Sequence, residues 1–329
     1  MSKKQAWGIY TPYIRDFINM KRSLDFKYVK QERILLHFDR FTTETGETEL
    51  GISKELADKW CVRRNNESYG YRYNRCVCIS QLSSYLCTLG IRSYIPRLPP
   101  FKFNFTPYIY SKKEIEAIFN AADLLIIHRR NMNTIIFIVP TLLRVLYGTG
   151  IRIGEALSLQ NNDVNLSENY ILVKDSKNGK QRMVPISESL SSVCKDYLNH
   201  RKRLPVMQSG DSPFFISLNG SATNPHIFLI WYFRIVLKAA GIPYAGNYRG
   251  PRIHDIRHTF ACHALAKMAE SGIDIYTSLP VLSTYLGHQS LSATNGYVKL
   301  TEAMYPGLLK DVNMICLNVF PNIENHEAD

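Results

Sequence analysis

This sequence has no long hydrophobic run and no paired-cysteine motif, and we expect no signal peptide. The most apolar stretch, residues 134–143, is too short to span a bilayer and contains Pro140. The seven cysteines are odd in number and none stands in a Cys-x-x-Cys pair, which argues against a disulfide scaffold and a ribbon-type zinc site. No apolar segment follows the N-terminal lysines, as it would in a signal peptide. We therefore expect a soluble, cytoplasmic protein.

Acidic residues are scarce relative to basic ones. The 329 residues include 40 Lys and Arg against 28 Asp and Glu, a formal net charge of +12. Residues 1–107 hold 18 of the basic and 10 of the acidic residues, and so carry two thirds of the surplus. Such a charge favours a polyanionic partner, either nucleic acid or an acidic membrane surface. The 45% hydrophobic content excludes wholesale disorder, and the length suits about two domains.

A proline-rich segment divides the chain. Four prolines fall within residues 94–107, a density that no helix tolerates, and they predict an extended linker. Before it, residues 1–93 carry apolar residues at helical spacing and predict a helical domain whose last helix ends at Gly90. After it, residues 108–329 predict a second domain that ends in a tail helix.

The second domain contains a hairpin signal. Residues 170–173 and 182–186 are strand-like and flank Asn178-Gly179, a tight-turn sequence. The patterning from residue 227 onward is helical. The predicted fold is therefore mainly α with a small antiparallel β-sheet: a helical N-terminal domain followed by a mixed α/β C-terminal domain.

Basic and aromatic residues alternate in residues 69–75, just ahead of the last helix predicted for the first domain. Arg72 and Arg75 are therefore candidates for contacts with a phosphate backbone beside exposed bases or sugars. The alternative is a solvated helix face along which the arginine side chains lie.

Two patterns in the second domain supply single cations. Arg152 follows Gly150 at a predicted helix start, where free backbone N–H groups, the helix dipole and the guanidinium together suit a phosphate. The alternative is an ion pair with Glu155. Lys177 stands beside the hairpin turn, from where it can enter a groove and give up a proton; an ordinary solvated hairpin tip is the alternative.

A third pattern combines histidine and arginine. His254 and Arg257 are three residues apart and share a helix face, an imidazole beside a guanidinium. A zinc site made of His254, His258 and Cys262 is the alternative, which we disfavour because no carboxylate stands at a suitable position.

The fourth pattern is Leu286-Gly287-His288, followed by Tyr297. We expect Gly287 to end one helix and Ser292 to cap the next, which places His288 in the turn and Tyr297 on a short helix. Taken alone, Tyr297 is equally well explained as a core or interface residue.

In sequence order the four patterns give Arg, Lys, His-x-x-Arg, His and Tyr. In that order and context the chain resembles the tyrosine recombinase (phage integrase) family, over roughly residues 108–305 by motif. The N-terminal part looks like the helical core-binding domain of that family. The interval between Arg257 and His288 is several residues longer than in compact Xer-like members and is similar to that of transposon-type recombinases.

The resemblance implies DNA cleavage and rejoining with no metal or nucleotide cofactor. Tyr297 would attack the scissile phosphate and form a 3′-phosphotyrosine. Arg152 and Arg257 would hold the non-bridging oxygens of the transition state.

The resemblance also implies the proton transfers. His254 would accept the tyrosine proton, and Lys177 would protonate the leaving 5′-oxygen. Lys174 and Lys180 are the alternatives for the lysine. His288 would hydrogen-bond a non-bridging oxygen.

The implied partner is double-stranded DNA, bound by a homotetramer on synapsed sites, with accessory recombinases or DNA-bending proteins as further partners and no membrane. The implied role is that of an integrase or transposase of a mobile element. The alternatives are a chromosome or plasmid dimer resolvase, a type IB topoisomerase, and a DNA-binding regulator without catalysis. The tail helix would dock either on a neighbouring subunit or on its own domain.

Overall fold

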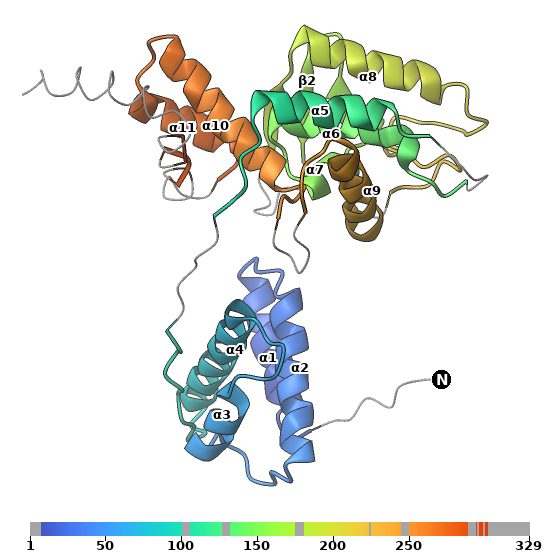
Figure 1. The fold of residues 1–329 in the computed structure, drawn as a ribbon. Helices are drawn as coiled ribbons and strands as arrows, with labels where there is room; N and C mark the ends of the chain where they lie inside the picture. The colour runs from blue at the N-terminus through green and yellow to red at the C-terminus, as the bar shows by residue number, and fades with distance from the viewer. Residues whose placement is uncertain are drawn as a thin grey trace, which may run out of the picture. The chain divides into compact units, whose positions relative to one another are not determined.

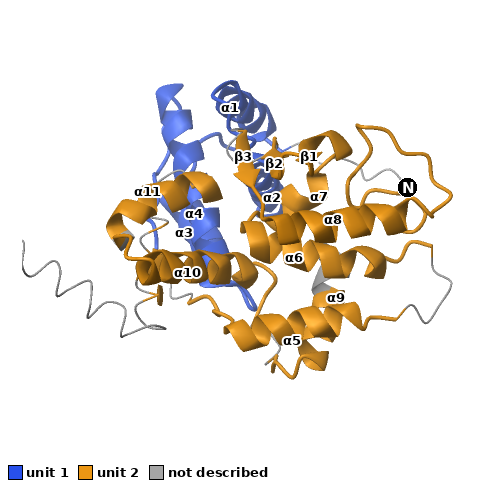
Figure 2. Cartoon of the chain, turned by 90° about the horizontal axis from the view of Figure 1, so that it is seen from above, with its two compact units in different colours: residues 1–105 blue, residues 106–329 orange. Residues whose placement is uncertain are grey.

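The computed structural model describes residues 8–100, 106–126, 132–174, 181–223, 225–244, 250–288, 294, 296–298 and 300–301. The chain divides into two compact units, residues 1–105 and 106–329 (Figure 2). The boundary falls inside the proline-rich segment 94–107. No described helix has both the length and the apolar character needed to cross a bilayer.

Unit 1 is helical. Its described part consists of α1 (Thr11–Ser23), α2 (Val29–Glu44), α3 (Lys54–Cys61) and α4 (Tyr69–Thr88) (Figure 1). The apolar faces of these helices meet around the buried rings of Phe17, Phe38 and Trp60. Residues 69–75 form the first turns of α4, whereas we expected them ahead of this helix.

Unit 2 is mostly helical, with one small sheet (Figure 1). In chain order its described elements are α5 (Lys112–Asp123), η1 (Ile136–Ile138), α6 (Val139–Thr149), α7 (Ile153–Ser158), η2 (Asn161–Asp163), β1 (Val164–Asn165), β2 (Tyr170–Val173), β3 (Arg182–Pro185), α8 (Glu188–Arg201), α9 (Pro225–Ala239), α10 (Asp255–Glu270) and α11 (Ile275–Leu286).

The sheet has the order β1-β2-β3, and both pairs are antiparallel. Ile171 in β2 stands opposite Val164 of β1 and Val184 of β3. The predicted pairing of the two hairpin strands is confirmed, while the Asn178-Gly179 turn lies outside the described residues. β1 was not predicted, because two residues carry too little pattern to be recognised. The fold is mainly α with a small antiparallel sheet, as predicted.

The centre of unit 2 is α6, whose buried residues are mostly apolar and which packs against α5, α8 and α10. In turn, α10 packs against α11, and α11 contacts β3. The C-terminal ends of α6 and α11, the N-terminal turn of α10 and the start of β3 meet in one place, where hydrogen bonds join them. The candidate site lies there.

Candidate active site

A tight turn holds Arg152 at the start of α7. Gly150 follows α6 with a left-handed backbone (φ +62°), which glycine adopts without strain. A Cβ there would stand 2.4 Å from Cδ1 of Phe260, so the turn also requires that no side chain be present. Arg152 then takes the N-cap position of α7, in agreement with the predicted helix start.

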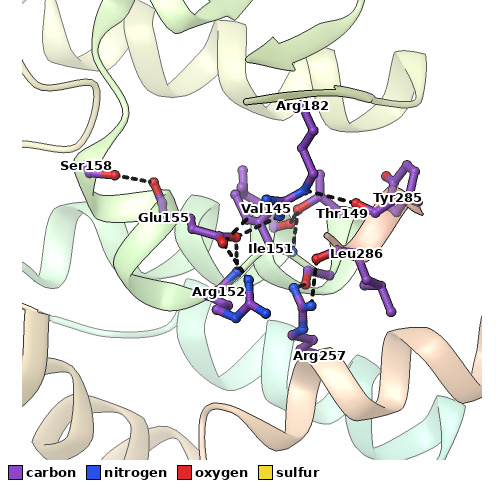
Figure 3. Close-up of polar contacts among 11 residues, drawn as sticks. Val145, Thr149, Ile151, Arg152, Glu155, Ser158, Arg182, Arg257, Tyr285 and Leu286 are labelled. Atoms are coloured by element: carbon purple, nitrogen blue, oxygen red, sulfur yellow. Dashed lines mark hydrogen bonds and ion pairs between the residues drawn. The ribbon is translucent and has the colours of Figure 1, made fainter. Parts of the chain in front are cut away.

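Glu155 joins two arginines (Figure 3). Its carboxylate lies 2.7 Å from Nη1 of Arg152 and 2.7 Å from Nη2 of Arg182, a residue of β3. Burial would raise the pKa of Glu155, but hydrogen bonds from Arg182 and Arg152 outweigh burial and lower it. Arg182 Nε also donates to the backbone oxygen of Tyr285 at 3.0 Å, which ties β3 to α11. The ion pair considered for Arg152 is thus present, yet 24% of that side chain stays exposed.

Arg257 reaches the same place from α10 (Figure 3). Its Nη1 donates to the backbone oxygen of Gly150 and its Nη2 to that of Leu286, each at 2.7 Å. Burial and then the positive charge of Arg152 lower the pKa of Arg257 to about 10, so the guanidinium remains charged at neutral pH. Each terminal nitrogen carries two N–H groups, so Arg257 can bridge the two carbonyls and still donate into the site.

His288 occupies the turn after α11. Gly287 caps this helix in the left-handed conformation, as predicted, and His288 follows it. The His288 Nδ1 atom lies 2.8 Å from Oγ1 of Thr294. Burial and then Arg257 lower the pKa of His288 to about 4, so the imidazole is neutral at pH 7. The predicted cap Ser292 lies outside the described residues.

Tyr297 has helical backbone, contacts two imidazole rings and is only 4% exposed. Its ring stacks on that of His288, with centroids 5.9 Å apart, and meets that of His258 at 5.6 Å and 51°. Burial raises the pKa of Tyr297, and the neighbouring Arg257 and Arg152 oppose this rise. The phenol therefore lies near two cations and in contact with two imidazole rings.

His254 directly precedes α10 at its N-cap position. Its ring meets that of His258 edge-on, with centroids 5.1 Å apart. Burial and then Arg257 lower the pKa of His254 to about 4, and the imidazole is neutral at pH 7. The zinc alternative gains nothing from this geometry, because the described residues contain no group of three or more His, Cys, Asp or Glu side chains suited to a metal.

The lysine is the least defined part of the site. Lys177 and the alternative Lys180 lie outside the described residues. The other alternative, Lys174, is paired through its Nζ with Oδ1 of the buried Asp163 at 2.5 Å. This ion pair makes Lys174 a poor proton donor for a leaving group.

The two arginines of α4 in unit 1 differ from what the sequence suggested. Arg75 is 1% exposed; its guanidinium pairs with Glu67 at 2.6 Å and donates to the backbone oxygens of Trp60 and Val62. The expected DNA contact from Arg75 is therefore wrong, because the side chain is part of the core. Arg72 is half-buried, and its Nε donates to the backbone oxygen of Cys61 at 2.8 Å.

Unit 1 carries instead a basic pocket that sequence analysis missed. This cavity of about 410 Å³ between α2, α3 and the residues after α3 is lined by His37, Arg40, Phe41, Glu44, Lys59, Trp60, Val62, Arg63 and Arg64. Arg64 lies over the ring of Trp60 at 4.5 Å, and Arg63 over that of Tyr69 at 4.3 Å. These side chains come from separate segments, and no local pattern announces them.

Sequence analysis also missed Arg182, and considered His258 only as a zinc ligand. A charged residue opening an apolar strand was the sole signal for Arg182. The structure brings five predicted residues of unit 2 into one site: Arg152, His254, Arg257, His288 and Tyr297. A buried tyrosine beside an arginine pair and neutral imidazoles suits phosphoryl transfer to a phenol.

Comparison with known proteins decides the family. The model of the phage integrase family matches residues 109–304. This chain belongs to the phage integrase family. The protein is a tyrosine-type site-specific recombinase, an enzyme that cleaves and religates DNA.

Relatives with similar sequence or structure support the assignment. The y4rB protein of Sinorhizobium fredii, which carries the name integrase/recombinase, is 30% identical over 288 residues, 87% of this chain and 91% of that protein. The Tn1549 transposon integrase, solved with a circular intermediate DNA, has a TM-score of 0.62 at 15% identity, covering 87% and 94% of the two chains. XerH recombinase, solved with its difH substrate before cleavage, has a TM-score of 0.60 at 22% identity, covering 84% and 78%.

Proposed function

We propose that this recombinase is the integrase of a mobile element and that Tyr297 is its nucleophile, which forms a covalent 3′-phosphotyrosine with DNA. The observation that carries the proposal is the position of Tyr297, whose phenol lies beside Arg257 and against the ring of His288. The covalent link conserves the energy of the phosphodiester bond, so rejoining needs no nucleotide cofactor.

Arg152, Arg257 and His288 bind the scissile phosphate. Arg152 is partly exposed, and Arg257 is held rigidly by two backbone carbonyls, so both guanidinium groups are oriented before DNA arrives. Preorganised donors stabilise the charge that develops on the non-bridging oxygens. Glu155 and Arg182 position Arg152 through the ion-pair network between them.

His254 accepts the phenol proton, and Lys177 protonates the leaving 5′-oxygen. A base must be unprotonated to act, and the lowered pKa of His254 keeps its imidazole neutral at pH 7. The raised pKa of the buried Tyr297 makes such a base necessary, since the phenol does not ionise by itself at neutral pH.

Unit 1 supplies the second DNA contact. The basic pocket binds phosphates of double-stranded DNA through Arg40, Lys59, Arg63 and Arg64, and Arg72 adds to them.

Replacing Arg63 by Gln should lower the slope of log K against log salt concentration by about one. Arg97→Gln, outside the pocket, is the matched control. An unchanged slope for Arg63→Gln would remove the pocket from the DNA interface.

The recombinase works as a homotetramer on two synapsed DNA sites, with accessory recombinases or DNA-bending proteins as further partners. The fold likeness to the Tn1549 transposon integrase and the long interval between Arg257 and His288 favour a mobile element. The similar fold likeness to XerH keeps a dimer resolvase as the second candidate.

The nucleophile can be tested with nicked suicide duplexes tiled across the DNA that flanks the gene. Wild type should form a protein–DNA adduct on denaturing gels, and Tyr297→Phe should form none while binding the same DNA. Tyr276→Phe, at an exposed tyrosine of α11, is the matched control and should react as wild type does. An adduct with Tyr297→Phe would show that another residue attacks.

The role can be tested on plasmids once a cleaved site is mapped. An integrase should join the two ends of its own element into a circle, detected by amplification across the junction. A resolvase should instead reduce a plasmid dimer that carries two copies of one site. Resolution without circle formation would replace the mobile-element proposal by the second candidate.

A further inference from the structure

The ring of His258 contacts both His254 and Tyr297. It follows His254 by one turn of α10, and its ring meets the His254 ring at 90° and the Tyr297 ring at 51°. The phenol ring of Tyr297 therefore contacts the rings of both His258 and His288. The roles proposed above use His254 and His288 but leave His258 without one.

The His258 imidazole leaves one nitrogen unused. Its Nδ1 atom is buried and has no hydrogen-bond partner among the described residues. Burying an unpaired polar atom costs about 1–3 kcal/mol, a cost that a phenylalanine or leucine at this position would avoid. A nitrogen retained at such a cost is explained if it finds a partner in another state of the site.

The surroundings keep this imidazole neutral. Burial lowers the pKa of His258 to about 3, and His254, Arg252, Arg257 and His288 lower it in the same direction. A neutral imidazole has one nitrogen that accepts a hydrogen bond. A phenol hydroxyl is a donor that it can accept from, and the Tyr297 ring is already in contact.

We propose that His258 orients the nucleophile: its ring holds the phenol ring of Tyr297, and its free nitrogen accepts a hydrogen bond from the Tyr297 hydroxyl when DNA is bound. This inference rests on the proposed role of Tyr297. The phenol has one proton, so this hydrogen bond places the oxygen before attack; the hydroxyl then turns from His258 to His254, which takes the proton as the oxygen bonds to phosphorus. Binding of DNA thus gives the buried nitrogen the partner that it lacks in the free protein.

Two substitutions distinguish the contribution of the His258 ring from that of its acceptor nitrogen. His258→Phe keeps an aromatic ring against Tyr297 and removes the acceptor, whereas His258→Asn loses the ring and keeps a planar acceptor near the position of Nδ1. Single-turnover cleavage of a suicide duplex at saturating protein, DNA affinity and thermal melting are measured for each. His263→Phe, on the same helix and next to Tyr147, controls for the loss of an imidazole from α10.

We expect His258→Phe to cleave about tenfold to a hundredfold more slowly, the size of one lost hydrogen bond in a buried site. Its DNA affinity should be unchanged and its melting temperature equal or higher, because the unpaired nitrogen is gone. A structural role cannot give slower cleavage together with unchanged or greater stability. His258→Asn should recover at least part of the lost rate.

Wild-type cleavage by His258→Phe would overturn the inference, as would His258→Asn being as slow as His258→Phe. Tyr297→Phe is measured in parallel to keep the two proposals apart. If Tyr297→Phe still forms the adduct, the assigned nucleophile is wrong. If it forms none while His258→Phe cleaves normally, only the role of His258 fails.

Discussion

Each unit of this recombinase contains a buried glutamate paired with arginine, and the two pairs serve different ends. In unit 1 Glu67 pairs with Arg75, and in unit 2 Glu155 pairs with Arg152 and Arg182. In both cases burial would raise the pKa of the glutamate, but hydrogen bonds from arginine and from the backbone outweigh it and lower the pKa. The local chemistry is the same.

The difference lies in whether the arginine keeps N–H donors that no group of the protein uses. Arg75 is 1% exposed, and its donors go to Glu67 and to the backbone oxygens of Trp60 and Val62. Arg152 leaves 24% of its side chain exposed beside the cluster around Tyr297. An arginine whose donors are consumed holds the fold together, whereas one that keeps donors at the surface can receive a substrate.

The largest expected effect is on stability and tests the pair of Glu67 and Arg75 in unit 1. Arg75→Met should lower the free energy of unfolding of unit 1 by about 3–5 kcal/mol, because it leaves the Glu67 charge buried without a partner. Urea unfolding followed by Trp60 fluorescence, in a Trp7→Phe/Trp231→Phe background, measures the loss. The double variant Arg75→Met/Glu67→Leu should recover most of it, since an apolar pair of similar volume avoids the buried charge. An undiminished stability of Arg75→Met with weaker DNA binding would reverse our assignment of this arginine.

The matching substitution in unit 2 should act on chemistry instead. Arg152→Ala should slow single-turnover cleavage about 10²–10³-fold, the cost of removing one preorganised donor from a developing charge. Its effect on unfolding should stay within about 1 kcal/mol, because the side chain is partly exposed and Glu155 keeps Arg182. A loss of stability as large as that of Arg75→Met would abolish the contrast between the two pairs.

The next expected effect is a different loss of stability in acid for the two units. Burial and then Arg257 lower the pKa of both His254 and His288 to about 4, below the ordinary value of about 6.5. Between these pH values the two histidines are protonated in the unfolded chain but stay neutral in the folded site. Unit 2 therefore loses stability as the pH falls from about 6.5 to about 4. The slope is about 1.4 kcal/mol per pH unit for each histidine.

Unit 1 should respond only at lower pH. The lowered pKa of Glu67 contributes stability that is complete above its unfolded value of about 4.5 and is lost below it. Urea midpoints at pH 6.5 and 4.8 check this, with Trp60 fluorescence reporting unit 1 and far-UV circular dichroism the whole chain. Equal shifts of both signals would mean that the histidines do not govern the acid response.

The contrast between the two arginines was partly readable in the sequence. Arg75 precedes Cys78, Ile79 and Leu82 by three, four and seven residues, which places it on the apolar face of α4. That spacing predicts burial, and the alternation of basic and aromatic residues obscured it. Arg152 was identified correctly at the start of a helix, because a glycine turn followed by a helix start is a local pattern.

Other features depend on segments distant in the chain. Helical spacing and the Asn-Gly turn sequence were enough for the fold class, and Gly287 for the end of α11. Arg182 acts only because β3 meets α7 and α11, and the basic pocket of unit 1 joins α2 to α3. Contacts of this kind follow from tertiary packing, which periodicity along one helix does not encode.

The smallest expected effect tests how tightly the ion-pair network of Glu155, Arg152 and Arg182 is packed. Gly272 and Gly287 both follow a helix with left-handed backbone, so replacing either by alanine should cost about 1 kcal/mol of stability. A Cβ at Gly272 meets nothing within 4 Å, whereas one at Gly287 stands 3.0 Å from Nη1 of Arg182.

Gly287→Ala must therefore push a guanidinium that Glu155 and the Tyr285 carbonyl already hold, while Gly272→Ala disturbs no such group. We expect Gly287→Ala to lose at least as much stability in urea as Gly272→Ala, and cleavage to be slower by about fivefold in Gly287→Ala alone, the rate equivalent of about 1 kcal/mol. Equal cleavage by the two variants would mean that Arg182 yields freely. The network around Glu155 would then position Arg152 no more strictly than a surface ion pair does, and the distinction between the two buried glutamates would rest on exposure alone.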